Sequence, residues 1–140
     1  MEIHITIDGE AVPQARPRVT RCGTYDPPKC RAYKQKVGLV AKTAMRGKKP
    51  LRGPVKMSII VYRGIPKSWT KKKKAAAMTG DVYPTTKPDI DNLLKGIMDA
   101  LKGICWADDA QVVKVDARKA YDACPRVHLK IWSGEENEHD

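Results

Sequence analysis

The stretch between Pro88 and Gly103 constrains the fold of this 140-residue chain more strongly than any other. At 100° of rotation per helical residue, its apolar side chains fall within one stripe roughly 100° wide. They are Ile90, Leu93, Leu94, Ile97 and Leu101. Pro88 favours a helix that starts at Asp89, and Gly103 favours its end after Lys102. A helix with a single apolar face has to bury that face against a second layer of structure.

Four other stretches show apolar side chains at every second position. This period predicts β-strands over residues 3–7, 55–61, 113–117 and 127–131. We expect the last two strands to pair with each other as a hairpin through residues 122–125.

Two further helices are expected. The first covers residues 31–46 and ends at Gly47, and its apolar positions recur at helical spacing: Tyr33, Val37, Val40, Ala41, Ala44 and Met45. The second is short and basic, over residues 69–78, with Ser68 as its N-cap and Gly80 as its end.

Together these elements predict one α/β (α+β) domain over residues 1–134, with helices packed on a mixed sheet. Residues 12–29 are rich in Pro and Arg and are interpreted as an irregular basic loop or a ragged hairpin. Residues 135–140 form an acidic tail that is expected to be disordered.

Charge is distributed unevenly along the chain, whose formal net charge is +11. The first 80 residues hold 19 Lys and Arg against 4 Asp and Glu, whereas residues 81–134 hold 8 of each sign. A basic half of this kind attracts a polyanion such as nucleic acid, with a merely solvated basic surface as the alternative. All eight acids of the second part are aspartates, which indicates a separate role for carboxylates there.

The sequence also excludes several classes of protein. No apolar run approaches the roughly 18 residues that cross a bilayer, and the N-terminus lacks the pattern of a secretory signal. We therefore expect no membrane association and a cytoplasmic location. The four cysteines lack metal-ligand spacing, so free thiols are favoured over zinc ligands. They are Cys22, Cys30, Cys105 and Cys124.

The start of the helix predicted after Pro88 carries the first candidate site. Asp89 and Asp91 lie within its first turn, and Lys95 lies one turn beyond Asp91 on the same face. Two carboxylates about 4 Å apart repel by about 4 kcal/mol at an effective dielectric constant near 20. A cation is therefore expected between them, either Lys95, a metal ion, or both, and oxygen ligands favour Mg²⁺ or Mn²⁺.

A structural interpretation of the same residues stays open. Asp89 is also a good N-cap, Asp91 also stabilises the helix dipole, and the Asp91–Lys95 pair is also an ordinary surface ion pair. A second acidic pair, Asp108 and Asp109, follows the helix after a short return segment and can lie beside it. Three or four carboxylates together in a basic protein favour a divalent ion that holds a phosphate.

The acidic segments resemble the RusA family of Holliday junction resolvases over three stretches: residues 87–95 (KPDIDNLLK), 98–101 (MDAL) and 106–112 (WADDAQV). The opening of the chain resembles it too, with an Ile-rich first strand, Gly9, Pro13 and the run Arg16-Pro17-Arg18. The resemblance spans residues 3–132. The short segment before Asp108 and the acidic tail depart from the family pattern.

This resemblance implies a small homodimeric endonuclease that needs Mg²⁺. Such enzymes bind four-way DNA junctions and cut two symmetry-related strands, which leaves ligatable nicks for recombination and repair. They are commonly encoded by bacteriophages and prophages. The catalytic acids of the family fall on Asp89, Asp91 and Asp109, its catalytic lysine falls on Lys95, and Asp108 is a further candidate metal ligand.

Basic residues outside this site are expected to hold the DNA backbone rather than to distinguish bases. They are Arg16, Arg18, Arg21, Lys71, Lys72, Lys73, Lys74 and Lys87. Trp69 and Trp106 are expected to belong to the core and not to stack on bases.

Two other functions compete with the nuclease. One is a branched-DNA-binding accessory protein without catalysis, against which the complete set of aspartates and Lys95 argues. The other is a metal-dependent hydrolase of nucleotides, which has no need of so basic an N-terminal half.

Overall fold

The computed structural model describes residues 1–15, 18–21 and 23–133, so the predicted acidic tail and Arg16 lie outside it. The strands are β1 (Glu2–Asp8), β2 (Arg18–Thr20), β3 (Gly23–Tyr25), β4 (Val55–Gly64), β5 (Val112–Asp122) and β6 (Arg126–Ser133). The helices are α1 (Pro28–Met45), α2 (Lys71–Met78), α3 (Ile90–Leu101) and the single 3-10 turn η1 (Asp109–Gln111).

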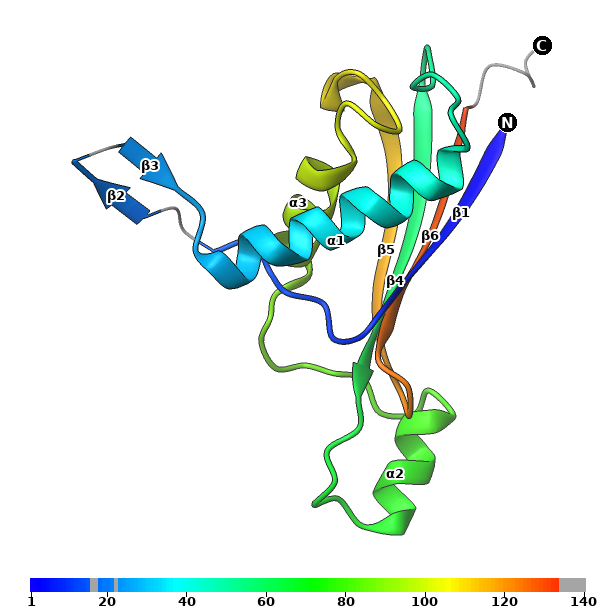
Figure 1. Ribbon diagram of the computed structural model, residues 1–140. Helices are drawn as coiled ribbons and strands as arrows, with labels where there is room; N and C mark the ends of the chain where they lie inside the picture. Colours follow the sequence, from blue (N-terminus) through cyan, green and yellow to red (C-terminus); the bar gives the residue numbers. More distant parts are fainter. Residues whose placement is uncertain (16–17, 22, 134–140) are drawn as a thin grey trace.

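Four strands form a mixed sheet in the order β1-β6-β4-β5 (Figure 1). β6 pairs antiparallel with β1 and with β4, while β4 and β5 are parallel. The predicted alternation becomes rows of buried side chains across the sheet. One row joins Ile5, Leu129 and Ile59, each no more than 2% exposed.

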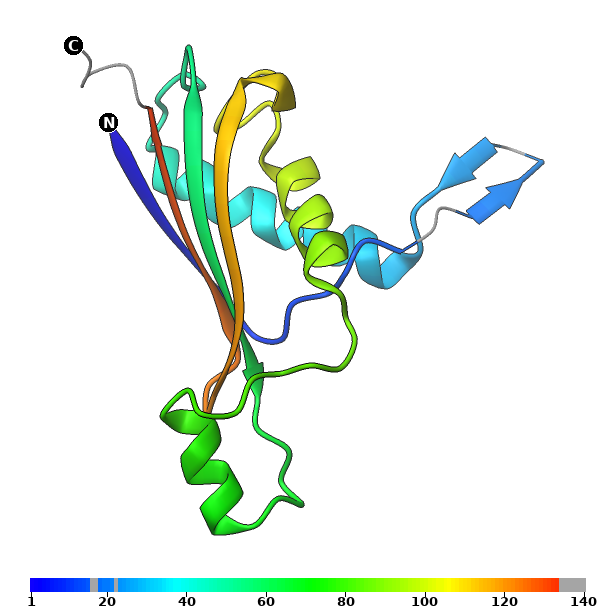
Figure 2. The same cartoon turned by 180° about the vertical axis from the view of Figure 1, so that it is seen from behind.

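Helices α1 and α3 lie side by side on one face of this sheet, and Figure 2 shows no described helix on the opposite face. Their apolar stripes close the core. From α1 it takes Val37, Ala41 and Met45, and from α3 it takes Leu93, Ile97 and Leu101. The prediction of one small α+β domain with helices on a mixed sheet is confirmed. No described helix is both long and apolar enough to cross a membrane.

The predicted hairpin between the last two strands is wrong, because β4 lies between β5 and β6. The connection over residues 123–125 passes the end of β4 and spans two strand spacings, about 10 Å, which so short a segment can bridge. β5 instead forms the edge of the sheet. Its alternating residues contribute to the core only in part. Val113 lies at an irregularity in the pairing with β4 and is 61% exposed, and Val115 is 37% exposed, whereas Ala117 packs against the core.

Two smaller predictions also fail. Ile90, expected in the buried stripe, is 37% exposed because it occupies the first position of α3, beyond the layer that covers the sheet. Ser68 is not the N-cap of α2, since the hydroxyl of Thr70 accepts the hydrogen bond from the Lys73 amide. Residues 66–69 form a turn instead, closed by a bond from the Trp69 amide to the Pro66 carbonyl.

Two basic elements project from the body in different directions. Strands β2 and β3 pair as the ragged hairpin predicted for the Arg-rich region, and they extend past the N-terminal end of α1 (Figures 1 and 2). Helix α2 lies beyond the opposite end of the sheet from the α1–β4 connection. The segment that leads to α3 runs between the β2–β3 hairpin and α2 in both views.

Candidate active site

The side chain of Asp89 does not cap helix α3, although Asp89 is the residue at its N-terminus that would be expected to do so. Asp89 occupies the N-cap position of α3 with an extended backbone, but its carboxylate makes no capping hydrogen bond. It is 54% exposed and lies 3.6 Å from the ammonium of Lys87, whose side chain is 87% exposed. An ion pair so open to solvent contributes little to stability, so the Asp89 carboxylate is left available to a ligand.

A shallow hollow on the surface of α3 gathers three of the predicted residues. Asp91, Lys95 and Asp109 line it together. The same hollow is lined by Leu94, Met98 and Asp99, which sequence reasoning did not assign to a site. Asp91, Lys95 and Asp99 follow one another at intervals of four residues. Helical spacing in the sequence could therefore have identified Asp99 as a neighbour of the other two. Asp89 lies two residues before Asp91 and outside this lining.

The two neighbouring acids after α3 have different surroundings. Oδ1 of Asp108 accepts a hydrogen bond from the Ala110 amide and caps η1. Asp109 instead accepts a 2.7 Å bond at Oδ1 from the indole Nε1 of Trp106, which is fully buried. The structure thus turns Asp109 toward the hollow and engages Asp108 in a local turn. Trp106 belongs to the core, as predicted.

Gln111 holds this acidic turn against the rest of the domain. Its Oε1 accepts bonds from the amides of Ala107 and Asp108, at 2.9 and 3.0 Å. Its Nε2 donates to the carbonyl oxygens of Leu51 and Gly53, at 2.9 and 3.1 Å. The turn that presents Asp109 is therefore fixed to the segment before β4, which sequence patterns did not indicate.

Asp99 connects the hollow to the base of the β2–β3 hairpin. Nζ of Lys34 on α1 lies 2.9 Å from Asp26 and 3.3 Å from Asp99. The hydrogen bond from Lys34 holds the pKa of Asp26 below its usual value, with help from Gln14. Partial burial lowers the pKa of Lys34, but the bonds to both aspartates outweigh it and the pKa rises.

The chain that enters the hairpin is also attached to α3. The backbone N–H of Gln14 donates a 3.0 Å bond to the main-chain carbonyl of Asn92. Gly96, one turn further along α3, allows this close approach, since a Cβ there would lie 3.4 Å from the Gln14 nitrogen. The hairpin is thereby held to the helix that carries Asp91 and Lys95.

The predicted DNA-binding residues are spread over separate elements. Lys71, Lys72 and Lys73 are exposed on α2, Lys74 is half-buried, and the Lys73 ammonium lies 4.0 Å above the ring of half-buried Trp69. Arg21 is exposed in the turn between β2 and β3, and Arg18 lies on β2. None of these lines the hollow with Asp91 and Asp109.

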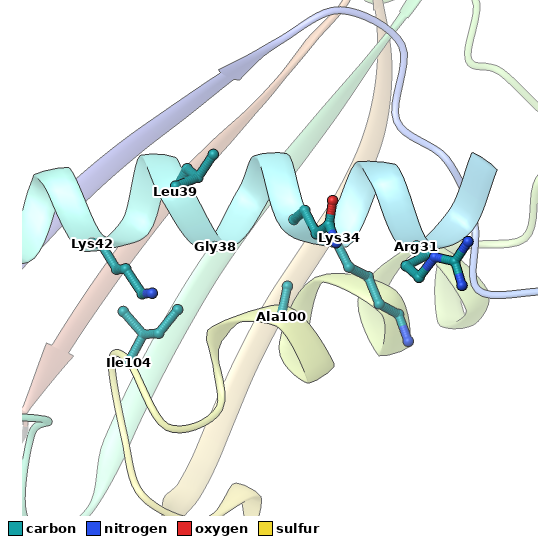
Figure 3. Close-up of a pocket in the computed structure, with 8 residues that line it drawn as sticks. Arg31, Lys34, Gly38, Leu39, Lys42, Ala100 and Ile104 are labelled. Carbon is teal, nitrogen blue, oxygen red and sulfur yellow. The ribbon is translucent and has the colours of Figure 1, made fainter. Parts of the chain in front are cut away.

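A second hollow adds basic residues that the sequence did not single out. Arg31, Lys34 and Lys42 of α1 line it together with Ala100 and Ile104 (Figure 3). It adjoins the first hollow through the contact between Lys34 and Asp99.

The donor atoms of the first hollow fit a hard divalent cation better than zinc. Asp91 and Asp109 offer carboxylate oxygens, and no His or Cys lines the hollow. Among the described residues, no group of three or more acidic, His or Cys side chains forms a metal cage by itself. Mg²⁺ commonly keeps several waters and binds through one or two carboxylates together with substrate phosphates, so two carboxylates can be enough to hold it.

Comparison with known proteins places this site in a family. Residues 8–132 match the family model of endodeoxyribonuclease RusA. An uncharacterized protein of Bacillus subtilis, YqaN, is 44% identical over 135 residues, covering 92% of this chain and 94% of that protein. The crossover junction endodeoxyribonuclease rusA of Lactococcus phage r1t is 30% identical over 79 residues, covering 56% of this chain and 53% of that protein.

The structure thus combines a small α+β domain with an acidic hollow and basic surfaces, and the family match names the class of protein. The chain belongs to the RusA family of endodeoxyribonucleases, and the resemblance noted in the sequence is confirmed. At the level of the family, its activity is endonucleolytic cleavage of DNA.

Proposed function

We propose that the protein is a divalent-metal-dependent endonuclease that resolves four-way DNA junctions by paired cuts in symmetry-related strands. The observation that carries the proposal is the hollow in which Asp91, Lys95 and Asp109 meet, in a chain of the RusA family. The crossover junction name of the phage relative supports the choice of substrate. Such a substrate is met in the cytoplasm of a bacterium, where a host or a phage gene would supply the enzyme.

The acids divide into different roles. Asp91 and Asp109 would hold Mg²⁺ or Mn²⁺, and Asp89 extends this acidic group at the start of α3. Bound there, the cation supplies Lewis-acid polarisation of a phosphate oxygen and acidification of a water molecule. We assign the second ligand position to Asp109 rather than Asp108, because Asp109 lines the hollow with Asp91 and Asp108 does not.

Lys95 acts on the phosphate and not on the metal. Its exposed ammonium stands one turn beyond Asp91 and lines the same hollow. A lysine at this place offsets the charge that accumulates on the phosphate oxygens during strand cleavage.

The DNA backbone would be held on both sides of the acids. The β2–β3 hairpin, with Arg18 and Arg21, lies on one side, and Lys71–Lys74 of α2 lie on the other (Figure 2). Arg16, which is outside the described residues, precedes the hairpin in the sequence and is proposed to contribute as well. Lys87 lies between them, next to Asp89. Backbone contacts of this kind orient DNA without distinguishing its sequence.

Paired cutting requires two copies of the site. One protomer carries a single acidic hollow of this composition among its described residues, so we propose a C₂ homodimer that presents two sites in matching orientation. Sedimentation of the protein with and without junction DNA measures this. A monomer in both conditions at micromolar concentration contradicts paired resolution.

The main test exchanges each acid for its neutral isostere. Asp89→Asn, Asp91→Asn and Asp109→Asn are expected to lower Mg²⁺-dependent cleavage of a four-way junction by orders of magnitude. Metal-free junction binding should hold or improve, because each exchange removes a charge that repels phosphate. Lys95→Ala should abolish cleavage while Mn²⁺ binding, followed by titration calorimetry, is largely kept.

The structure supplies a matched control for these variants. Asn is as good a helix cap as Asp, so Asp108→Asn should keep the η1 turn and most of the activity. Variants at Asp89, Asp91 and Asp109 that cut normally, or that lose folding and binding together with cleavage, would identify these acids as structural. A wild-type protein that binds four-way junctions but does not cut them would instead be the DNA-binding accessory of the alternative hypothesis. Linear duplex DNA, and EDTA in place of Mg²⁺, complete the comparison.

A further inference from the structure

Lys119 occupies a position on β5 where a charged side chain is unexpected. It is paired in register with Val61 of β4, which is 1% exposed and faces the core. Paired residues of adjacent strands share a face of the sheet, so Lys119 projects toward the helices and not toward the open side. Lys119 is half-buried there, and an ammonium that is partly withdrawn from water is costly unless hydrogen-bond acceptors face it.

The acceptors are two main-chain carbonyls of the segment that leads to α3. Nζ of Lys119 donates to the oxygen of Thr86 and to the oxygen of Pro88, both at 2.9 Å. These two carbonyls flank Lys87, and Pro88 directly precedes Asp89. One side chain of the sheet therefore fixes both ends of the tripeptide that presents Lys87 and Asp89.

Packing holds the first part of this segment, where Pro84 is buried, whereas Thr85, Thr86 and Lys87 are exposed. Among the described residues, residues 83–88 are hydrogen-bonded to the rest of the chain through the two bonds that Lys119 donates to their carbonyls. Segments with few hydrogen bonds open locally at low free energy. The Lys119 contact is thus well placed to decide how rigidly the acids at the start of α3 are presented.

The stability of α3 does not explain why a lysine occupies position 119, close to the N-terminus of that helix. The N-terminus of a helix carries a partial positive charge and favours an anion nearby. Lys119 reaches the carbonyl just before the N-cap of α3, so its charge opposes the helix dipole. The position is favourable for the carboxylates of Asp89 and Asp91, which follow directly.

We propose that Lys119 is a positioning residue, which holds residues 86–88 so that Asp89 and Asp91 are presented to the metal and phosphate. This inference rests on the proposed nuclease function. Lys119 acts through the backbone and touches neither the metal nor the scissile phosphate.

The test compares Lys119→Met with Lys119→Arg and with a control lysine on the same strand. Lys114 is exposed and lies in register with Lys56 on the opposite face of the sheet, so Lys114→Met removes an equal charge without touching the segment. Three quantities are measured for each variant: kcat on a four-way junction, metal-free junction affinity, and amide hydrogen exchange by mass spectrometry.

Lys119→Met is expected to lower kcat at least tenfold while junction affinity stays within about twofold of wild type. Amide exchange should rise at least tenfold over residues 85–91 and remain unchanged in β1 and β6. Lys119→Arg should restore both kcat and exchange in large part, because a guanidinium also donates to two carbonyls. Lys114→Met should change neither.

Wild-type kcat in Lys119→Met, or unchanged exchange over residues 85–91, would overturn the proposal. Increased exchange throughout the domain would overturn it as well, since Lys119 would then support the fold as a whole. If the wild-type protein fails to cut, the proposed nuclease function is wrong. In that case Mn²⁺ affinity replaces kcat as the functional measurement. Mn²⁺ affinity and amide exchange over residues 85–91 then decide together whether Lys119 positions the acids.

Discussion

The indole nitrogen of Trp106 and the carboxylate of Asp109 are joined by a 2.7 Å hydrogen bond that runs from the core to the acidic hollow. Trp106 is fully buried and Asp109 is half-buried. A rigid side chain of the core thus fixes the orientation of an acid at the surface. The second carboxylate oxygen, Oδ2, is left for a ligand, while Oδ1 is held by the indole.

Replacement of Trp106 by Phe removes this hydrogen bond and some volume from the core. We expect destabilisation of roughly 1–3 kcal/mol together with a fall in kcat of about tenfold or more. Cleavage is measured well below the melting temperature, so that unfolding does not contribute. Trp69→Phe is the matched control, since the Trp69 ring contacts Tyr121 and Lys73 and lies outside the lining of the acidic hollow. Equal kcat values for the two variants would argue against an orienting role of Trp106.

Removal of the Gln111 side chain should loosen the acidic turn. Gln111→Ala removes four hydrogen bonds and leaves two carbonyls and two amides without partners, at an expected cost of roughly 1–3 kcal/mol in the free energy of unfolding. Gln111→Glu keeps the acceptor and removes only the donors, so it should be intermediate. Urea denaturation of the three proteins measures the order. A Gln111→Ala variant as stable as wild type would show that water replaces these bonds at no cost.

The contact between Lys34 and Asp26 predicts a specific dependence of stability on pH. Asp26 has a folded-state pKa below its usual value of 3.8, so its ionised form stabilises the folded protein at neutral pH. This contribution disappears as the pH falls through the lowered pKa. The difference in unfolding free energy between wild type and Asp26→Asn should therefore be largest near pH 7 and shrink below about pH 4. Chemical denaturation at pH 7, 5 and 3 measures it, and a difference that grows toward low pH would contradict the assignment.

The exposed lysines of α2 are expected to contribute to the salt dependence of DNA binding. Removal of one lysine–phosphate interaction should make the slope of log K against log salt shallower by about 0.9, so the pair Lys71→Gln and Lys72→Gln should change it by up to about 2. The double variant Lys48→Gln and Lys49→Gln is the control, since the α1–β4 connection lies at the opposite end of the sheet (Figure 1). Fluorescence anisotropy with a junction at several salt concentrations gives the slopes. Equal slopes for the two double variants would remove α2 from the interface.

Much of the local structure follows from the order of residues alone. The alternation in residues 3–7, 55–61 and 127–131 and the stripe of Leu93, Ile97 and Leu101 became the core, because each pattern leaves only one face that can be buried. The spacing of Asp91, Lys95 and Asp99 placed these side chains on one side of α3, since helical geometry brings every fourth residue together.

Tertiary structure decided the pairing of the strands and the partners of the acids. The alternation in β5 did not reveal that β4 would separate it from β6, because a strand's own pattern defines its faces and not its neighbours. Likewise, the family resemblance placed a catalytic acid on Asp109, but the neighbouring residues in the sequence give no physical reason for preferring it to Asp108. Their environments diverge only once Trp106 is buried and Gln111 reaches the carbonyls of Leu51 and Gly53. The Gln111 bonds join segments about 60 residues apart, so they depend on the packed domain and not on local propensity.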